Sequence, residues 1–346
     1  MLIVGCDFHP SWEQVAWLDT ETGETGEEKL PHLKEEVEGF YRRLPAPALI
    51  GLEATGNCHW LVDLLEDLGH EVWIGDAAQI RARYVRQQKT DRRDAAHILK
   101  LLVEGRLPRL WQPDREQRDR RQLLIHRHKL VEIRARVKNG LQHLALNQGV
   151  QKKARLWSKA GQQVLRELPL RPWAARRRED LLGLLQVLDQ QIAPLDAAVA
   201  DAVQQDDQAR LLMSQSGVGP ITALAFVLTI GDVSRFRRSK QVASYLGLIP
   251  REHSSGGHQR LGAISKQGNR FLRMLLVEAA QQAVRYAPEF RREYQHRCHS
   301  KPKAVAKVAA ARKLAVRLYW MLRTQTARPE SVRIESSPRV PLVGAS

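Results

Sequence analysis

The amino-acid sequence predicts an α/β domain at the N-terminus, followed by a long, mainly helical and strongly basic remainder. Three observations support this expectation. Short β-rich runs alternate with amphipathic helical segments in the first 80 residues, apolar seams with heptad-like spacing recur through the middle of the chain, and the net charge changes sign near residue 80. Alternating strands and helices build layered α/β folds, whereas apolar residues at steps of three and four indicate packed helices.

The chain has 346 residues, which is enough for two or three domains with substantial cores. Its three cysteines, Cys6, Cys58 and Cys298, form neither a disulfide framework nor a zinc-ligand spacing. The N-terminus has no signal-peptide pattern, and the longest mainly apolar stretch, 221–230, is far shorter than the ~20 residues that cross a bilayer. We therefore expect a reduced, cytoplasmic protein without membrane spans.

The elements of the N-terminal domain follow from hydrophobic period and turn residues. The expected strands are 2–8, 13–19, 46–54 and 71–75, and the expected helices are 31–44 and 59–69. The turn-rich ETGETGEE that follows the second strand suggests hairpins within a mixed sheet.

Four carboxylates stand at positions where a charge is costly. Asp7 lies inside the first strand, Glu53 ends the third, and Asp91 and Asp94 share one helix face at i and i+3. A buried cluster of acids costs several kcal/mol unless cations neutralise it, and two Mg²⁺ ions about 3.5–4 Å apart on a scissile phosphate would do so. Each acid alone can instead be a helix cap or a surface ion pair, and capping is the stronger alternative for Asp91.

Two apolar seams run through the middle of the chain and predict long helices. The first comprises Leu123, Leu130, Ile133, Val137, Leu141 and Leu144, and the second comprises Leu181, Leu185, Leu188, Ile192, Leu195, Val199 and Ala202. Prolines in the link between the seams should interrupt a single rod. An antiparallel helical hairpin and a dimerising coiled coil fit this pattern equally well.

The charge distribution points to a polyanionic partner. Residues 1–80 hold 4 Lys or Arg against 16 Asp or Glu, whereas residues 81–346 hold 51 against 22. An excess of positive charge in residues 81–346 favours a nucleic-acid partner, whose binding should weaken as salt rises. The alternative is that the basic helices are simply solvated surfaces. The candidate nucleic-acid contacts on the first long helix are Arg120, Arg121, Arg127, Arg134 and Lys138.

The segment SQSGVGPITALAFVLTIG (214–231) fits a helix-hairpin-helix pattern. In that pattern the backbone N–H groups near Gly217 and Gly219 grip a phosphate at a helix N-terminus. A simple turn between two helices explains the glycines equally well.

Three motifs, GCDFHP, GLEATG and KTDRRDA, occur in the order found in the DEDD transposases of the insertion sequence 110 family, which this chain resembles. That family comprises bridge-RNA-guided serine recombinases related to the Piv and MooV invertases. The resemblance implies a RuvC-like, RNase H-like N-terminal fold, with Asp7, Glu53, Asp91 and Asp94 as the metal-binding positions.

A further segment, SYLGLIPREHSSGGHQRLG, is similar to the family's C-terminal serine segment. The resemblance implies a nucleophilic serine, and we favour Ser255, directly before Gly256, over Ser254. The cations Arg251, Arg260 and Lys266 would hold the phosphate. A serine needs an activator, and because no Ser-His-Asp arrangement is apparent, we expect metal from the acidic domain. The alternative is a loop that binds phosphate without covalent chemistry.

The resemblance implies four regions: a RuvC-like catalytic domain at 1–108, a helical coiled-coil region at 109–205, a C-terminal transposase domain at 206–325 and a flexible tail at 326–346. The expected protein is a DNA recombinase that excises and inserts a mobile element, guided by a non-coding bridge RNA that pairs with donor and target DNA, and assembled as a dimer or tetramer. The alternatives are a metal-dependent, junction-resolving nuclease that lacks serine chemistry, and a nucleic-acid-binding scaffold without activity.

Overall fold

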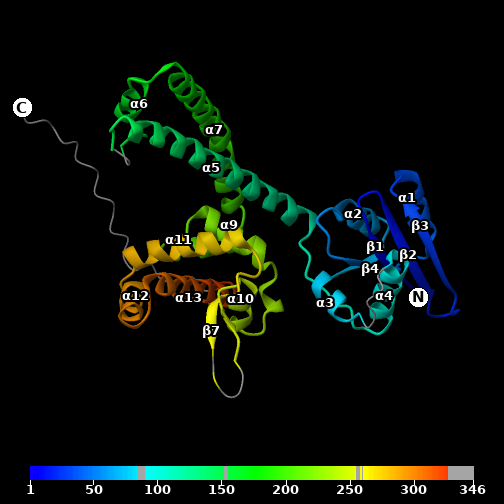
Figure 1. The fold of residues 1–346 in the computed structure, drawn as a ribbon. Coiled ribbons are helices and arrows are strands. Elements are labelled where there is room, and N and C mark those ends of the chain that lie inside the picture. Colours follow the sequence, from blue (N-terminus) through cyan, green and yellow to red (C-terminus); the bar gives the residue numbers. More distant parts are fainter. Residues whose placement is uncertain (85–89, 152–154, 255–257, 259, 326–346) are drawn as a thin grey trace, which may run out of the picture. The chain divides into compact units, whose positions relative to one another are not determined.

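The computed structural model describes residues 1–84, 90–151, 155–254, 258 and 260–325 (Figure 1). Ser255 and the tail 326–346, on which two expectations rest, lie outside the described residues. The chain divides into two compact units, Met1–Arg115 and Glu116–Ser346.

The first unit is a mixed five-stranded sheet with helices on both faces. The sheet has the order β3-β2-β1-β4-β5, in which β1 is antiparallel to β2 and parallel to β4. The strands are β1 (Leu2–Phe8), β2 (Trp12–Asp19), β3 (Thr25–Pro31), β4 (Leu49–Glu53) and β5 (Glu71–Gly75), and the helices are α1 (Lys34–Arg43), α2 (His59–Asp67), α3 (Ala77–Ala82) and α4 (Asp91–Val103). This is the mixed α/β sheet expected from the sequence, and it is consistent with an RNase H-like fold.

The central strand β1 is buried along its whole length because helices cover both of its faces. Val4 and Cys6 pack with residues of α1 and α2, including Tyr41 and Leu61. Ile3, on the opposite face, packs with α3 and α4. A strand buried on both sides reads as a continuous apolar run, which is why Asp7 stands out in it.

Strand β3 falls in the segment that the sequence analysis assigned to turns. It pairs antiparallel with β2 at the edge of the sheet, and Leu30 is its one buried residue. An edge strand needs backbone hydrogen bonds on one side only and is often charged, so it carries no strong apolar alternation.

In its described residues, the second unit is helical apart from one short pair of antiparallel strands. Its elements are α5 (Arg115–Asn147), α6 (Lys159–Arg166), α7 (Pro172–Gln204), α8 (Asp207–Met213), α9 (Pro220–Ile230), η1 (Val233–Arg235), α10 (Ser239–Tyr245), β6 (Pro250–Glu252), β7 (Leu261–Ile264), α11 (Arg270–Tyr286), α12 (Pro288–Ser300) and α13 (Lys303–Thr324). Within the described part of the chain, no helix is long and apolar enough to span a membrane.

The two seams form an antiparallel hairpin of α5 and α7 within one chain (Figure 1). Arg127 pairs with Asp196 at 2.6 Å and Arg134 with Asp189 at 2.9 Å, so positions advance along α5 as they retreat along α7. The antiparallel hairpin, one of the two arrangements that the sequence left open, is therefore present within the chain, and pairing of protomers through the seams stays a prediction. One seam residue, Ile133, is 40% exposed and does not join the core.

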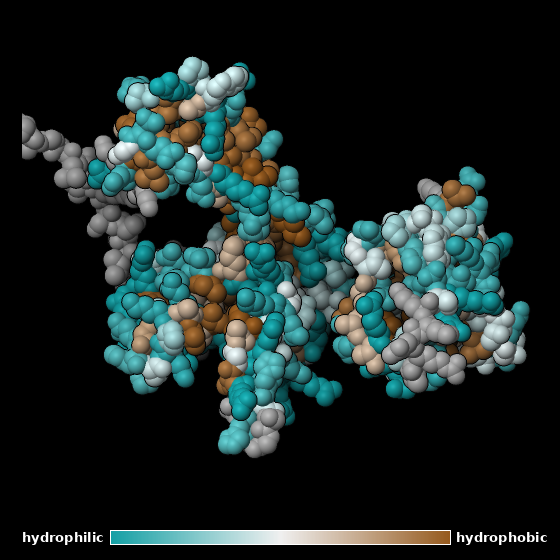
Figure 2. Space-filling model, viewed as in Figure 1, coloured by the Kyte–Doolittle hydropathy of each residue, from teal (hydrophilic) through white to brown (hydrophobic). Residues whose placement is uncertain are grey.

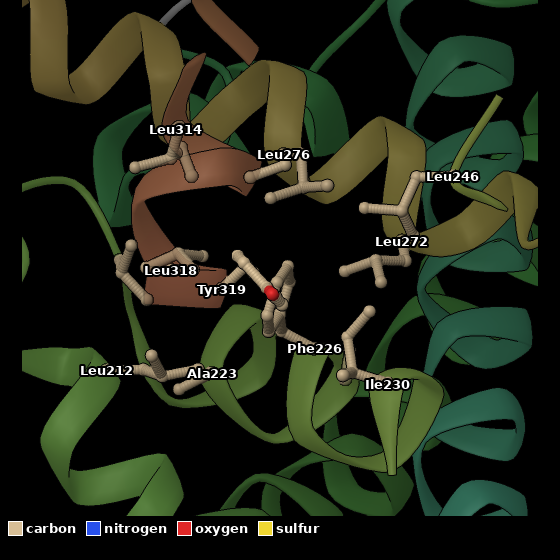
Figure 3. Close-up of a cluster of buried hydrophobic side chains, with 14 of the residues drawn as sticks. Leu212, Ala223, Phe226, Ile230, Leu246, Leu272, Leu276, Leu314, Leu318 and Tyr319 are labelled. Atoms are coloured by element: carbon tan, nitrogen blue, oxygen red, sulfur yellow. The ribbon is translucent and has the colours of Figure 1, made fainter. Parts of the chain in front are cut away.

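A second core lies among the C-terminal helices (Figure 3). Phe226 of α9 and Tyr319 of α13 are fully buried at its centre, and the Tyr319 hydroxyl donates to the Phe236 carbonyl at 2.9 Å. Leu124 of α5 and Val199 of α7 also belong to this core. The C-terminal helices therefore share one core with residues of α5 and α7.

Candidate active site

The carboxyl ends of β1 and β4 bring Asp7 and Glu53 to neighbouring positions. The two strands are parallel, and Cys6 is paired with Leu52, so the next residue on each strand is an acid. A Cβ added at Gly5 would point at α4, as would one at Gly51. Because side chains alternate along a strand, Asp7 and Glu53 belong to this same, α4-facing side of the sheet.

Helix α4 lies directly on this side of the sheet because Gly5 has no side chain. A Cβ at Gly5 would stand 2.4 Å from both the Ala95 carbonyl oxygen and the Leu99 nitrogen, which no real Cβ does. The close approach places the first turn of α4, which carries Asp91 and Asp94, beside the end of β1. A larger residue at position 5 would push the helix, and both acids, away from Asp7.

Three of the four predicted carboxylates act on one another electrostatically. Burial is the largest cause that raises the pKa of Asp7 above its usual value, the nearby His9 opposes that rise, and the charges of Asp94 and Asp91 add to it. Asp94 is also buried, at 8% exposure. Negative charges close to a carboxyl group disfavour its ionisation unless cations are bound nearby. Such an environment is typical of a cation-binding site.

The two acids of α4 have different local environments. Thr90 occupies the N-cap position and Asp91 is the first helical residue, so Asp91 is not the capping residue that the sequence left possible. The Tyr84 hydroxyl donates a hydrogen bond to Asp94, and burial together with this bond raises the pKa of Tyr84. Tyr84 was not identified from the sequence, since it lies seven residues before the DRRD motif and no periodic signal marks it.

His9 is a second residue that sequence reasoning missed. Its Nε2 lies 3.2 Å from Asp7 Oδ2 and 3.6 Å from Asp91 Oδ1. One ligand atom from each of Asp7, His9 and Asp91 lies within 4.8 Å of the others. The available signal was the D-x-H spacing in GCDFHP, in which the histidine follows the end of the strand.

Glu53 is half-buried at the end of β4, on the same side of the sheet as Asp7. Within the described residues it does not join the group of ligand atoms formed by Asp7, His9 and Asp91. The structure thus brings Asp7, Asp91 and Asp94 together and places Glu53 next to them by strand register alone.

The donor set fits a divalent metal. Carboxylate oxygens are the ligands that Mg²⁺ and Mn²⁺ prefer, and imidazole adds a donor suited to transition metals. A bound cation would relieve the repulsion among Asp7, Asp91 and Asp94. The raised pKa of Asp7 therefore describes the site without metal.

The described residues of the serine segment belong to the second unit, and Ser254 follows directly after β6 and His253. Ser254 is held there, because its hydroxyl donates to Glu252 Oε1 at 2.6 Å and accepts from the Arg260 backbone N–H at 3.1 Å. Ser255 lies outside the described residues. The predicted phosphate-binding cations Arg251, Arg260 and Lys266 are all exposed on or beside strands β6 and β7.

Gly217 and Gly219 lie in the turn between α8 and α9. Gly217 has a φ of +86°, and a Cβ there would stand 2.4 Å from the Ala279 carbonyl oxygen of α11. Packing against α11 is therefore sufficient to explain this glycine. Gly219 is the N-cap of α9 and has open space around it, so a phosphate contact there stays a prediction.

The predicted nucleic-acid contacts on α5 are engaged inside the unit. Arg120 pairs with Glu116, Arg121 donates to the Leu228 carbonyl of α9, and the Lys138 ammonium lies 5.1 Å from the centre of the Trp157 ring. Arg127 and Arg134 hold α7 through the two ion pairs that define the hairpin. These side chains stabilise the helical packing, and their contact with nucleic acid stays a prediction.

Family models match two long segments of the chain. A model for the DEDD transposases of IS110 elements matches residues 4–148, and a model described as "Transposase IS116/IS110/IS902 family" matches residues 209–295. The first segment contains all four acids, and the second contains the whole β6–β7 hairpin.

Several curated transposases are similar over most of this chain. A probable family 20 transposase of Pseudomonas aeruginosa is 33% identical over 296 residues, which are 83% of this chain and 87% of the relative. The transposase for insertion sequence element IS1328 of Yersinia enterocolitica is 27% identical over 81% of this chain and 84% of the relative. The transposase for insertion sequence element IS1111A of Coxiella burnetii is 30% identical over 59% of this chain and 57% of the relative.

Proposed function

The chain belongs to the IS116/IS110/IS902 family of transposases, which cut and rejoin DNA, and we propose that it does so with a divalent-metal carboxylate centre and a serine nucleophile. One observation carries the proposal: Asp7, Asp91 and Asp94 are gathered at the end of β1, where their like charges act on one another.

Asp7, Glu53, Asp91 and Asp94 would hold two divalent ions, for which Mg²⁺ is the expected species. The ions, when bound, would activate the attacking hydroxyl and stabilise charge on the scissile phosphate. The protein's own part is to hold the carboxylates in place: α4 is fixed against Gly5, and Tyr84 fixes Asp94 by its hydrogen bond. Such preorganisation reduces the rearrangement that the reaction requires.

The serine would link covalently to one DNA end. Its hydroxyl oxygen forms an ester bond to phosphorus, the bond from phosphorus to the leaving DNA oxygen breaks, and that oxygen leaves as a hydroxyl that takes up the proton lost by serine. Rejoining reverses the step when another DNA hydroxyl displaces the serine. Ser255 is the proposed nucleophile, because the Ser254 hydroxyl already donates to Glu252 and accepts from the backbone of Arg260 within the hairpin.

Sequence choice would be delegated to a non-coding RNA that pairs with donor and target DNA. Residues 81–346 hold 51 Lys or Arg against 22 Asp or Glu, and this excess of positive charge supports nucleic-acid binding. Purification from cells followed by sequencing of the bound nucleic acid tests this part directly. Recovery of one structured RNA supports guidance, and recovery of DNA alone contradicts it.

Recombination must hold several scissile phosphates at once, so we propose at least a dimer. The α5–α7 hairpin offers a surface for pairing, since hydrophobic residues gather on it in Figure 2, and Ile125, Ile133, Leu184 and Val187 are each 40% exposed or more. Light scattering should give at least twice the chain mass of 39.4 kDa, and a monomer both alone and with nucleic acid contradicts the proposal.

The decisive experiment for the serine is a denaturing gel of labelled DNA after incubation with the protein. Wild-type protein should give a slowly migrating DNA–protein adduct that protease removes. Ser255→Ala should abolish the adduct yet bind nucleic acid nearly normally, because one neutral hydroxyl contributes only about 1 kcal/mol. Ser254→Ala is the matched control and should retain the adduct.

Each alternative outcome indicates a different activity for the protein. An adduct that persists in Ser255→Ala but disappears in Ser254→Ala moves the nucleophile by one residue. DNA hydrolysis without any adduct indicates a junction-resolving nuclease that uses the carboxylates alone. Nucleic-acid binding without cleavage or adduct indicates a scaffold.

A further inference from the structure

The position of His9 relative to two carboxylates suits one metal ion. Its Nε2 stands 3.2 Å from Asp7 Oδ2 and 3.6 Å from Asp91 Oδ1. Adjacent ligands of an octahedral ion with bonds of about 2.1 Å are about 3 Å apart. Both distances from Nε2 are close to this spacing, and the ligand atoms of all three residues lie within 4.8 Å of one another.

The imidazole is held in this position by its surroundings. The His9 ring stacks on the Trp12 ring with centroids 4.1 Å apart and an angle of 23°. The turn that carries it is closed by the His9 N–H donating to the Trp12 carbonyl at 2.9 Å. Behind the turn, the His32 backbone N–H donates to the Ser11 carbonyl at 2.9 Å, and His32 Nδ1 lies 3.3 Å from the Pro10 carbonyl oxygen. A ligand fixed by such packing costs little entropy on binding.

A simple ion pair with Asp7 explains this geometry less well. A protonated Nε2 carries one hydrogen, which cannot point straight at both Asp7 and Asp91, two acids from different elements. A cation placed among the three atoms would accept an electron pair from each of them.

On the basis of the proposed metal centre, we propose that His9 is a nitrogen ligand of the ion held by Asp7 and Asp91. The resulting site has mixed nitrogen and oxygen donors. Imidazole favours transition metals over Mg²⁺, so this position should bind Mn²⁺ more tightly than Mg²⁺.

Pulsed electron paramagnetic resonance on Mn²⁺-loaded full-length protein tests the assignment without relying on activity. Wild-type protein should show hyperfine coupling to a histidine nitrogen, and the pattern should change when the protein is labelled with ¹⁵N-histidine. His9→Gln should lose the coupling and bind Mn²⁺ about 10–100-fold more weakly, with a smaller loss for Mg²⁺. His126→Gln, which removes an exposed histidine of α5, is the matched control and should change neither quantity.

The outcomes separate this inference from the proposed function. Mn²⁺ that binds wild-type protein without nitrogen coupling, or coupling that survives in His9→Gln, overturns the role of His9 and leaves the carboxylate centre intact. Mn²⁺ binding that is equally weak in wild-type protein and Asp7→Asn overturns the metal centre itself. The labelling experiment uses wild-type protein, so the absence of histidine coupling overturns the role of His9 even if His9→Gln does not fold.

Discussion

The N-terminal sheet and the α5–α7 hairpin use charge in opposite ways. At the end of β1, Asp7 is held near Asp91 and Asp94, and burial together with the charges of these two aspartates raises the pKa of Asp7. Along the hairpin, Arg127 and Arg134 of α5 each meet an aspartate of α7. The sheet therefore gathers charges of one sign, whereas the hairpin pairs each of these arginines with an aspartate of its own.

The difference separates a site from a scaffold. Opposite charges that meet within a unit stabilise its packing and are satisfied there, whereas gathered like charges cost free energy unless a ligand neutralises them. A sequence shows only how many charges each segment carries. The arrangement of partners shows which charges remain to be neutralised by a metal or a nucleic acid.

The largest expected effect comes from removing one of the gathered acids. Asp7→Asn should lower the rate of strand cleavage by about a thousandfold or more, because metal ions contribute several kcal/mol to such reactions. Glu66→Gln, at an exposed position of α2, is the matched control and should cleave normally. Thermal melting should show Asp7→Asn folded and no less stable in the absence of metal. Full cleavage activity in Asp7→Asn contradicts the site.

Salt should weaken nucleic-acid binding strongly if exposed cations of residues 81–346 bind phosphate. Six phosphate contacts would lower affinity about a thousandfold between about 50 and 200 mM salt. The slope of log affinity against log salt measures the number of contacts. A flat dependence would mean that the basic side chains serve packing alone.

Arginines of α5 should contribute differently to the stability of the protein, depending on whether they contact other helices. Arg121 donates to the Leu228 carbonyl, so Arg121→Ala should lower the free energy of unfolding by about 1.5–3 kcal/mol. Arg136 is exposed on the same helix, and Arg136→Ala should change stability by less than about 0.5 kcal/mol. Denaturant titration measures both changes. Equal losses in the two variants would contradict the division into packing and surface arginines.

The smallest effect expected is on the pH dependence of stability. Because the pKa of Asp7 is raised in the folded protein, its contribution to stability is fully present below the unfolded value of about 3.9 and is lost as pH rises through the folded value. Metal-free wild-type protein should therefore lose stability relative to Asp7→Asn across this window, and a divalent cation should restore it. If the free energy of unfolding depends on pH in the same way in both proteins, the raised pKa of Asp7 is contradicted.

The periodic elements of the fold were predictable from the sequence. Strands β1 and β5 have the expected bounds, because each is a short run rich in β-branched and aromatic residues between turn signals. Strand β3 was not predictable, since an edge strand with one buried residue carries no apolar period. The hairpin of α5 and α7 was expected as one of two alternatives, and the choice depended on contacts between distant residues.

The sequence drew attention to Asp7 and Glu53 because they lie within or at the end of apolar runs, and to Asp91 and Asp94 because they share one helix face. Metal binding by these acids stays a prediction. Their mutual proximity required the register of β1 with β4 and the close approach of α4 to Gly5, neither of which a single sequence shows. His9 and Tyr84 were missed for the same reason: each is an ordinary polar residue until the fold places it against an aspartate.

Sulfur substitution at the scissile phosphate tests most directly whether the gathered acids hold metal against DNA. Replacing a non-bridging oxygen by sulfur should slow cleavage in Mg²⁺, which binds sulfur poorly, and Mn²⁺ or Cd²⁺ should restore it, because softer ions accept sulfur. The Mn²⁺ rescue should be absent in Asp7→Asn. Cleavage of the sulfur-substituted DNA at the same rate in Mg²⁺ and Mn²⁺, or rescue that persists in Asp7→Asn, would contradict a metal centre built on Asp7.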